Sequence, residues 1–151
     1  MVKAVVFDFI GTLVSVKNYS LEDSELKLHK ALVEVGFEVG EKEFLEAYSK
    51  AHEKYRVIRY EQLVEVTNGV WISDALKQLG FEIGCEDERL KTAINVFFED
   101  YLESLELNPC VEEMFTKLSS RYKIGLISNF TYAPVIYAGL RKLGLDKYLS
   151  V

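Results

Sequence analysis

The sequence predicts an α/β protein, with a partial parallel-sheet core and an inserted α-helical segment that we call the cap. Two apolar, β-branched runs predict the strands of the core, one near each end of the chain. The long segment between these runs carries apolar residues at helical spacing instead. A helix is also expected on each side of the second run. Strands joined by helices are typical of a parallel sheet, and consecutive helices between them favour an insertion.

The core is expected to comprise residues 1–15 and 108–151. Its first strand is predicted over residues 3–8, where β-branched and apolar side chains dominate, and its second over residues 123–128, KIGLIS. Two strands alone do not make a stable α/β sheet. Either further strands are concealed within the predicted helices, or the chain lacks the rest of its sheet.

The helices of the core are predicted from their end signals. Asn108 and Pro109 suit an N-cap followed by proline at the first helical position, and apolar spacing continues that helix to Leu118. Residues 134–143 predict the second helix, and Gly144 ends it.

The cap is expected over residues 16–107 as four helices. Ser20 and Asp23 form a plausible capping pair at the start of the first helix. The second helix follows the stripe from Phe44 to Ile58, and the third covers residues 70–79. The fourth carries an aromatic stripe that runs from Leu90 to Leu105.

Composition limits the classes of partner. The 151 residues are 49% hydrophobic and 28% charged, as expected for a globular protein, and the net charge is −6. This negative charge argues against a nucleic-acid backbone or an anionic membrane as partner. No apolar stretch approaches the roughly 20 residues that span a bilayer. Two cysteines, Cys85 and Cys110, make no disulfide framework, which favours a cytoplasmic location.

Polar residues follow both predicted strands. Asp8 ends the first strand, and Ser128 and Asn129 end the second. Ligands of open parallel sheets bind at the carboxyl ends of the strands, so these side chains meet in one crevice if the strands are neighbours. A carboxylate there can act as a nucleophile. Gly11 lets the backbone turn closely around a ligand, and Thr12 can donate a hydrogen bond to an anion.

This arrangement resembles the haloacid dehalogenase superfamily, whose core is Rossmann-like. The first motif of that superfamily is an apolar strand followed by Asp-x-Asp-Gly-Thr-Leu, and residues 8–13 read Asp-Phe-Ile-Gly-Thr-Leu. Its second motif is an apolar strand that ends in Ser or Thr, often followed by Asn, and residues 125–129 read Gly-Leu-Ile-Ser-Asn. The helical insertion between the motifs is similar to the cap of the superfamily. The resemblance covers the whole chain in order.

The resemblance implies a role for each matching residue. Asp8 would be the nucleophile that forms an aspartyl intermediate. Thr12 and Ser128 would hold the transferring group, while Asn129, with Gly11, would contact a small anionic substrate. In the phosphotransferases of the superfamily, Mg²⁺ is held by the first aspartate, by the carbonyl two residues on, and by later acids. Here the first two contacts would be the Asp8 carboxylate and the backbone carbonyl of Ile10.

Ile10 stands where phosphatases of the superfamily carry their second aspartate, the general acid–base. Such a group contributes about 10² to 10⁴ in rate, which isoleucine cannot supply. Members that act on carbon, including 2-haloacid dehalogenases, also lack this aspartate, because halide leaves without a proton. Those enzymes use no metal and carry an arginine early in the cap, whereas residues 20–50 contain none. Phosphate-ester hydrolysis is therefore favoured, and 2-haloacid dehalogenation is the alternative.

The later motifs of the superfamily, a lysine and an acidic pair, find no match in this chain. The sequence stops near the point where the next core strand is expected, which favours a fragment of a longer hydrolase. A second reading is a catalytically degenerate module that binds a small anion or a partner protein. The substrate and the oligomeric state stay open at this stage.

Overall fold

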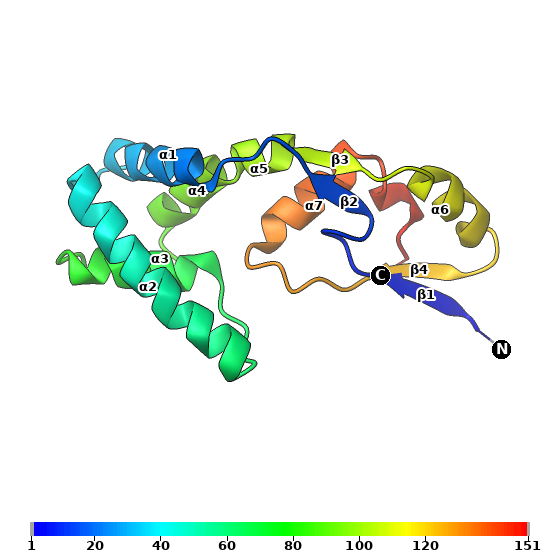
Figure 1. The fold of residues 1–151 in the computed structure, drawn as a ribbon, viewed down its shortest axis with the longest axis horizontal. Helices are drawn as coiled ribbons and strands as arrows, with labels where there is room; N and C mark the ends of the chain where they lie inside the picture. The colour runs from blue at the N-terminus through cyan, green and yellow to red at the C-terminus, as the bar shows by residue number, and fades with distance from the viewer. Residues whose placement is uncertain (1, 151) are drawn as a thin grey trace. The chain divides into compact units, whose positions relative to one another are not determined.

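The structure is a computed structural model that describes residues 2–150 (Figure 1). Its contacts divide the chain into two compact units. The first unit contains the residues up to Tyr19 together with those from Tyr101 onward, and the second contains Ser20–Asp100. Both termini of the chain therefore belong to the first unit, which we call the core unit.

Two parallel strands form the sheet of the core unit. Strand β1 (Ala4–Phe7) pairs with β4 (Lys123–Leu126), in a register that sets Ala4 opposite Lys123 and Phe7 opposite Leu126 (Figure 1). This pairing confirms the predicted parallel sheet. On the other side of β4, Leu149 forms a parallel bridge with Ile124, and the Ser150 N–H donates to the Ile124 carbonyl at 2.8 Å.

A second pair of strands was missed in the sequence. Strand β2 (Val14–Val16) pairs antiparallel with β3 (Leu105–Leu107). The prediction that Leu105 continues the fourth helix is wrong: that segment ends as α4 (Glu88–Phe97), followed by the short α5 (Glu99–Glu103). Leu105 is only 2% exposed, and a buried leucine at this position fits the apolar face of a helix as well as that of a strand. The strand has only three residues, which are too few to show the alternation of a strand in the sequence.

The contacts of these strands divide the chain at other residues than the boundaries predicted for the cap. Residues 16–19 and 101–107, which the sequence assigned to the cap, lie in the core unit by their contacts. The reason is that β2 and β3 pair with each other and precede and follow the helical segment. The assignment of that segment as a cap stays a prediction.

Helices α6 (Val111–Ser119) and α7 (Ala133–Lys142) and the 3₁₀ turn η1 (Asp146–Tyr148) complete the core unit. The Phe115 ring is fully buried and contacts the rings of Phe7 and Tyr148, with centroids 5.2 and 5.7 Å away. The buried apolar cluster of this unit includes residues of β2, β3, β4, α6 and α7, and Phe7 of β1 packs against it partly buried; the cluster comprises Phe9, Leu13, Val14, Leu105, Val111, Phe115, Ile124, Ile136, Leu140 and Leu145.

The predicted start of α6 is wrong by two residues. The residue that caps α6 is Cys110, in the left-handed region with φ of 67°, and not Asn108. Asn108 contributes its hydrogen bonds to the loop after β1 instead, as described below. The Asn-Pro pair suits both an N-cap and a tight turn, and sequence spacing does not separate the two.

Replacing Cys110 by glycine is expected to stabilise the protein. The left-handed conformation costs an L-residue about 1–2 kcal/mol, and glycine adopts it without that strain. The greater freedom of glycine in the unfolded chain offsets part of the gain, so the net change is expected to be about 1 kcal/mol. The measurement is urea unfolding of Cys110→Gly. Cys110→Ser, which keeps the strained Cβ, is the matched control and should unfold at the wild-type midpoint.

The second unit consists of helices, as predicted. They are α1 (Leu21–Glu34), α2 (Glu41–Glu61), α3 (Asn68–Gln78) and α4. Helix α1 packs on α4, and α2 packs on α3. The predicted capping pair is confirmed, because the Ser20 Oγ accepts a hydrogen bond from the Asp23 N–H at 3.1 Å. Throughout residues 2–150, each helix is too short or too polar to cross a bilayer.

Candidate active site

The predicted nucleophile lies at the carboxyl end of β1. Phe7 is the last residue of the strand, and its carbonyl accepts a hydrogen bond from the Ile127 N–H at 2.9 Å. Asp8 and Ser128 therefore follow the ends of neighbouring parallel strands; the Asp8 side chain is exposed and Ser128 is half-buried. The sheet thus brings the two predicted residues to the same edge, where ligands of such folds bind.

The backbone after Asp8 makes a tight turn around the Phe9 carbonyl. This oxygen accepts hydrogen bonds from the amides of Thr12, Leu13 and Val14, at 3.2, 2.9 and 3.2 Å. The Phe9 side chain is fully buried and anchors the turn in the core. Gly11 has φ of 80°, which glycine adopts readily, so its place in the motif has a conformational reason.

Thr12 holds the carboxylate of Asp8. Its Oγ1 donates a hydrogen bond to Asp8 Oδ2 at 3.1 Å. This hydrogen bond restricts the rotation of the carboxylate, which is the nucleophilic group. This bond connects two residues that the sequence singled out separately.

Asn108 is a residue of the site that the sequence did not identify. Its Nδ2 donates to the Thr12 carbonyl at 2.9 Å, and its backbone N–H donates to the Leu13 carbonyl at 3.0 Å. Asn108 thus stabilises a turn that lies almost a hundred positions earlier in the chain. The Asn108-Pro109 pair was the available signal, but it was assigned to the helix that follows.

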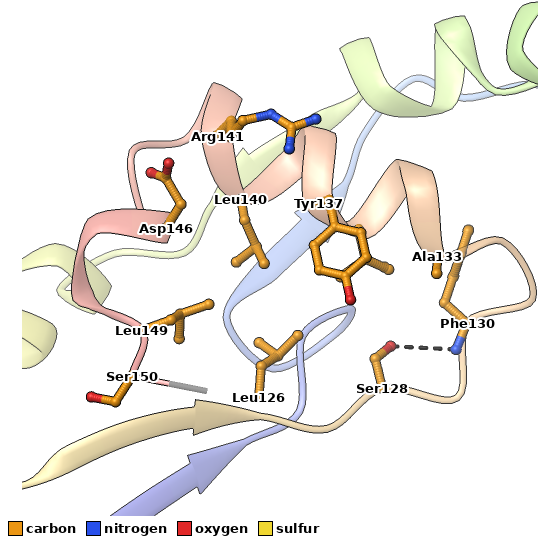
Figure 2. Close-up of a pocket in the computed structure, with 11 residues that line it drawn as sticks. Leu126, Ser128, Phe130, Ala133, Tyr137, Leu140, Arg141, Asp146, Leu149 and Ser150 are labelled. Atoms are coloured by element: carbon orange, nitrogen blue, oxygen red, sulfur yellow. Dashed lines mark hydrogen bonds between the residues drawn. The ribbon is translucent and has the colours of Figure 1, made fainter.

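Ser128 lies at the mouth of the loop after β4. Its Oγ accepts a hydrogen bond from the Phe130 N–H at 3.3 Å (Figure 2). The serine also borders a cavity of about 560 Å³ beside α7, where Leu126, Tyr137 and Leu140 provide much of the wall (Figure 2). Asp8 is not among the residues that line this cavity. Asn129, which follows, is exposed.

Aromatic contacts hold the loop of Ser128. The Phe130 ring lies against Tyr101, with centroids 5.1 Å apart, and Tyr101 meets the edge of Tyr19 at 5.0 Å. Burial, assisted by Tyr19, raises the pKa of the Tyr101 hydroxyl to about 12, so this hydroxyl stays protonated throughout the neutral range. The contacts therefore support the serine loop without adding charge near it.

Lys142 does not act at this site. Its ammonium group donates to the carbonyls of Leu102 and Glu103 and to the Glu103 carboxylate, at 2.9–3.0 Å. It thus caps the C-terminal end of α5, where the helix dipole favours a cation. The lysine that the resemblance requires beside a bound anion is not supplied by this residue.

Comparisons with known proteins agree with the motifs. A family model described as haloacid dehalogenase-like hydrolase matches residues 2–151. A solved 2-haloacid dehalogenase from Pseudomonas syringae pv. Tomato DC3000 shares 22% identity with a TM-score of 0.55, and the alignment covers 99% of this chain and 62% of that one. A predicted phosphoglycolate phosphatase from Haemophilus somnus 129PT shares 23% identity with a TM-score of 0.41, over 99% of this chain and 60% of that one. No curated protein matches the sequence.

The first of these structures supports the fold alone, because its identity is below 25%. The chain spans about three fifths of the length of the two solved proteins. The family model, in contrast, matches nearly every residue, including both motifs at the strand ends. Taken with the parallel pairing of β1 and β4 and the turn that presents Asp8, this match means that the chain belongs to the haloacid dehalogenase-like hydrolases.

Proposed function

We propose that the protein hydrolyses a phosphate ester of a small molecule, with Asp8 as the nucleophile. The observation that carries the proposal is the hydrogen bond that holds the Asp8 carboxylate against Thr12 at the carboxyl end of β1. Ser128, at the end of the adjacent strand, supplies a second hydroxyl at this edge. A carboxylate held in place by one hydroxyl, with a second hydroxyl at the same edge to donate to an anion, suits attack on a tetrahedral anion.

The reaction would proceed in two displacements. In the first, an Asp8 carboxylate oxygen attacks phosphorus, the bond from phosphorus to the ester oxygen breaks, and the ester oxygen leaves with the bonding electron pair as an alkoxide or aryloxide, which takes a proton from solvent. In the second, water attacks the phosphorus of the aspartyl phosphate and loses a proton to solvent. Inorganic phosphate then departs and the Asp8 carboxylate is regenerated. Ser128 would donate a hydrogen bond to a phosphoryl oxygen in both steps, while the Thr12 hydroxyl, which has one proton to donate, would hold Asp8 Oδ2 during the first.

Ile10 determines which esters suit such a site. No carboxylic acid stands at this position to protonate the departing oxygen, so an alcohol of high pKa would leave slowly. An aryl or acyl phosphate leaves as a stabilised anion and needs less help. The proposal therefore includes a preference for activated phosphate esters or anhydrides.

The donors of this chain suit Mg²⁺ in type. The Asp8 carboxylate and the Ile10 backbone carbonyl are oxygen ligands, and the turn N–H groups bond to the Phe9 carbonyl rather than to that of Ile10. Residues 2–150 contain no cluster of three or more acidic, histidine or cysteine side chains. Mg²⁺ would therefore be held by these two oxygens with waters and the phosphate of the substrate, as is usual for this ion. When bound, it would neutralise charge on the phosphoryl group.

Removal of the metal provides the test. The intact protein is expected to release p-nitrophenol from p-nitrophenyl phosphate in the presence of Mg²⁺, to lose this activity in EDTA, and to recover it when excess Mg²⁺ is added. An alkyl phosphate should be hydrolysed more slowly, because its leaving group needs a proton. Phosphate release that is equally fast in EDTA, with a metal-free protein, would contradict the proposal.

Dehalogenation is the second candidate, and Ile10 is the observation that favours it. Asp8 would attack the halogen-bearing carbon, the carbon–halogen bond would break, and water would then hydrolyse the resulting ester at its carbonyl carbon. Halide release from 2-chloropropionate that persists in EDTA would support this alternative. The lack of an arginine in residues 20–50 is the reason we place it second.

We also propose a cytoplasmic location for the reaction. Both cysteines, Cys85 and Cys110, are free thiols, and Cys110 is exposed. Free exposed thiols persist most readily in a reducing compartment.

A further inference from the structure

We infer that Asn108 is a positioning residue for the nucleophile Asp8; this inference rests on the proposed function. Asn108 follows β3 directly and lies within the core unit. It touches neither the carboxylate nor the hydroxyl of the site in any bond described above. Its two donors reach the backbone of the turn that carries them.

The two hydrogen bonds fix one end of that turn. Asn108 Nδ2 reaches the Thr12 carbonyl at 2.9 Å, and the Asn108 N–H reaches the Leu13 carbonyl at 3.0 Å. The other end is fixed by the Phe9 carbonyl, which collects three amides. The turn is thus held by hydrogen bonds within it, to the Phe9 carbonyl, and by hydrogen bonds from Asn108, a residue distant in sequence.

The effect reaches the carboxylate through Thr12. The Thr12 carbonyl is held by Asn108, and the Thr12 hydroxyl holds Asp8 Oδ2 at 3.1 Å. A shift of the Thr12 backbone therefore moves the donor that orients the nucleophile. A misplacement of about 1 Å in a reacting group can cost about 10²-fold in rate.

The side chain of Asn108 is well prepared for this task. Pro109 restricts the backbone of the preceding residue to extended conformations, so little freedom is lost when the amide bonds to Thr12. The half-buried Asn108 also lines, with Thr12 and Met114, a cavity of about 290 Å³ beside the turn. The turn therefore has space to move into once the amide no longer holds it.

The experiment compares Asn108→Ala and Asn108→Asp with the control Thr116→Val. The aspartate has the shape of asparagine but cannot donate when ionised. Thr116 donates to the Glu112 carbonyl at 2.9 Å, so its variant loses a comparable bond to the backbone away from the site. We expect kcat for p-nitrophenyl phosphate to fall about 10- to 100-fold in both Asn108 variants, with KM and the melting temperature near wild type. Thr116→Val should keep the wild-type kcat.

Amide hydrogen exchange of Thr12, Leu13 and Val14 gives a readout that does not depend on activity. These amides should exchange faster in both Asn108 variants and at the wild-type rate in Thr116→Val. Unchanged kcat, or unchanged exchange, in Asn108→Ala would overturn the inference. A rise in KM alone, or a loss of kcat that follows the loss of folded protein, would overturn it as well.

Failure of the proposed function is recognised separately. It would appear as an inactive wild type, or as equal activity in wild type and Asp8→Asn. Faster exchange in the Asn108 variants would then still support the tether on the turn, while unchanged exchange would overturn the tether too.

Discussion

Asp8→Asn is expected to lose phosphatase activity by a factor on the order of 10⁴ to 10⁶, the scale on which removal of a catalytic nucleophile or its partner acts in other hydrolases. The amide that replaces the carboxylate is a poor nucleophile, so the first displacement stops. The fold should persist, because the amide oxygen can still accept the hydrogen bond from Thr12. The measurement is the initial rate of p-nitrophenol release at saturating Mg²⁺.

The control for this variant is Asp23→Asn. Asp23 is an exposed aspartate in the first turn of α1, and its backbone amide, not its carboxylate, bonds to Ser20. The Asp23→Asn variant removes the same negative charge at a position away from the site. Retention of more than a small fraction of the wild-type rate in Asp8→Asn would show that another group is the nucleophile.

Phe115→Ala is expected to reduce the free energy of unfolding by about 3–5 kcal/mol, as for other large aromatic residues of a core. The ring is fully buried on α6 and lies between Phe7 of β1 and Tyr148 of η1. Its removal leaves a cavity beneath the strand that presents Asp8. Since whole domains are stable by only about 5–15 kcal/mol, a clear fall in the melting temperature should follow.

Tyr137→Ala is the matched control, because it removes an aromatic ring that is 62% exposed on α7. Surface changes of this kind usually stay within about 0.5 kcal/mol. Calorimetry or urea unfolding of the three proteins gives the comparison. Equal stability of Phe115→Ala and Tyr137→Ala would mean that the packing described for α6 is not that of the protein in solution.

The sequence predicted what depends on local patterns. Val5 and Val6 lie in a short, β-branched apolar run that is typical of a strand, and the apolar run at residues 123–128 is similarly short, so both strands of the sheet were found. Ser20 has a recognisable partner three residues later, so the start of α1 was found as well. Motifs at the two strand ends were sufficient to identify the family.

What the sequence missed depends on contacts between distant segments. Leu105 is in a strand because Val16 lies beside it, and nothing near Leu105 in sequence reveals that neighbour. Asn108 serves the turn after Asp8 because of the same return of the chain. Cys110 adopts a conformation typical of glycine, which composition alone would not suggest. In each case tertiary context overrides a local preference.

The pairing of β2 with β3 has a consequence for the order of folding. Parallel pairing of Ala4 with Lys123 closes a very long loop, and the entropy of closing such loops makes non-local sheets form slowly. The packing of α1 on α4 brings the two ends of the helical segment together, and the pairing of Val14–Val16 with Leu105–Leu107 continues that contact into the core unit. Once β2 and β3 are paired, the effective loop that closes when β1 pairs with β4 contains only the residues outside the segment between β2 and β3. Weakening the pairing of β2 with β3 should therefore slow refolding of the sheet more than it speeds unfolding.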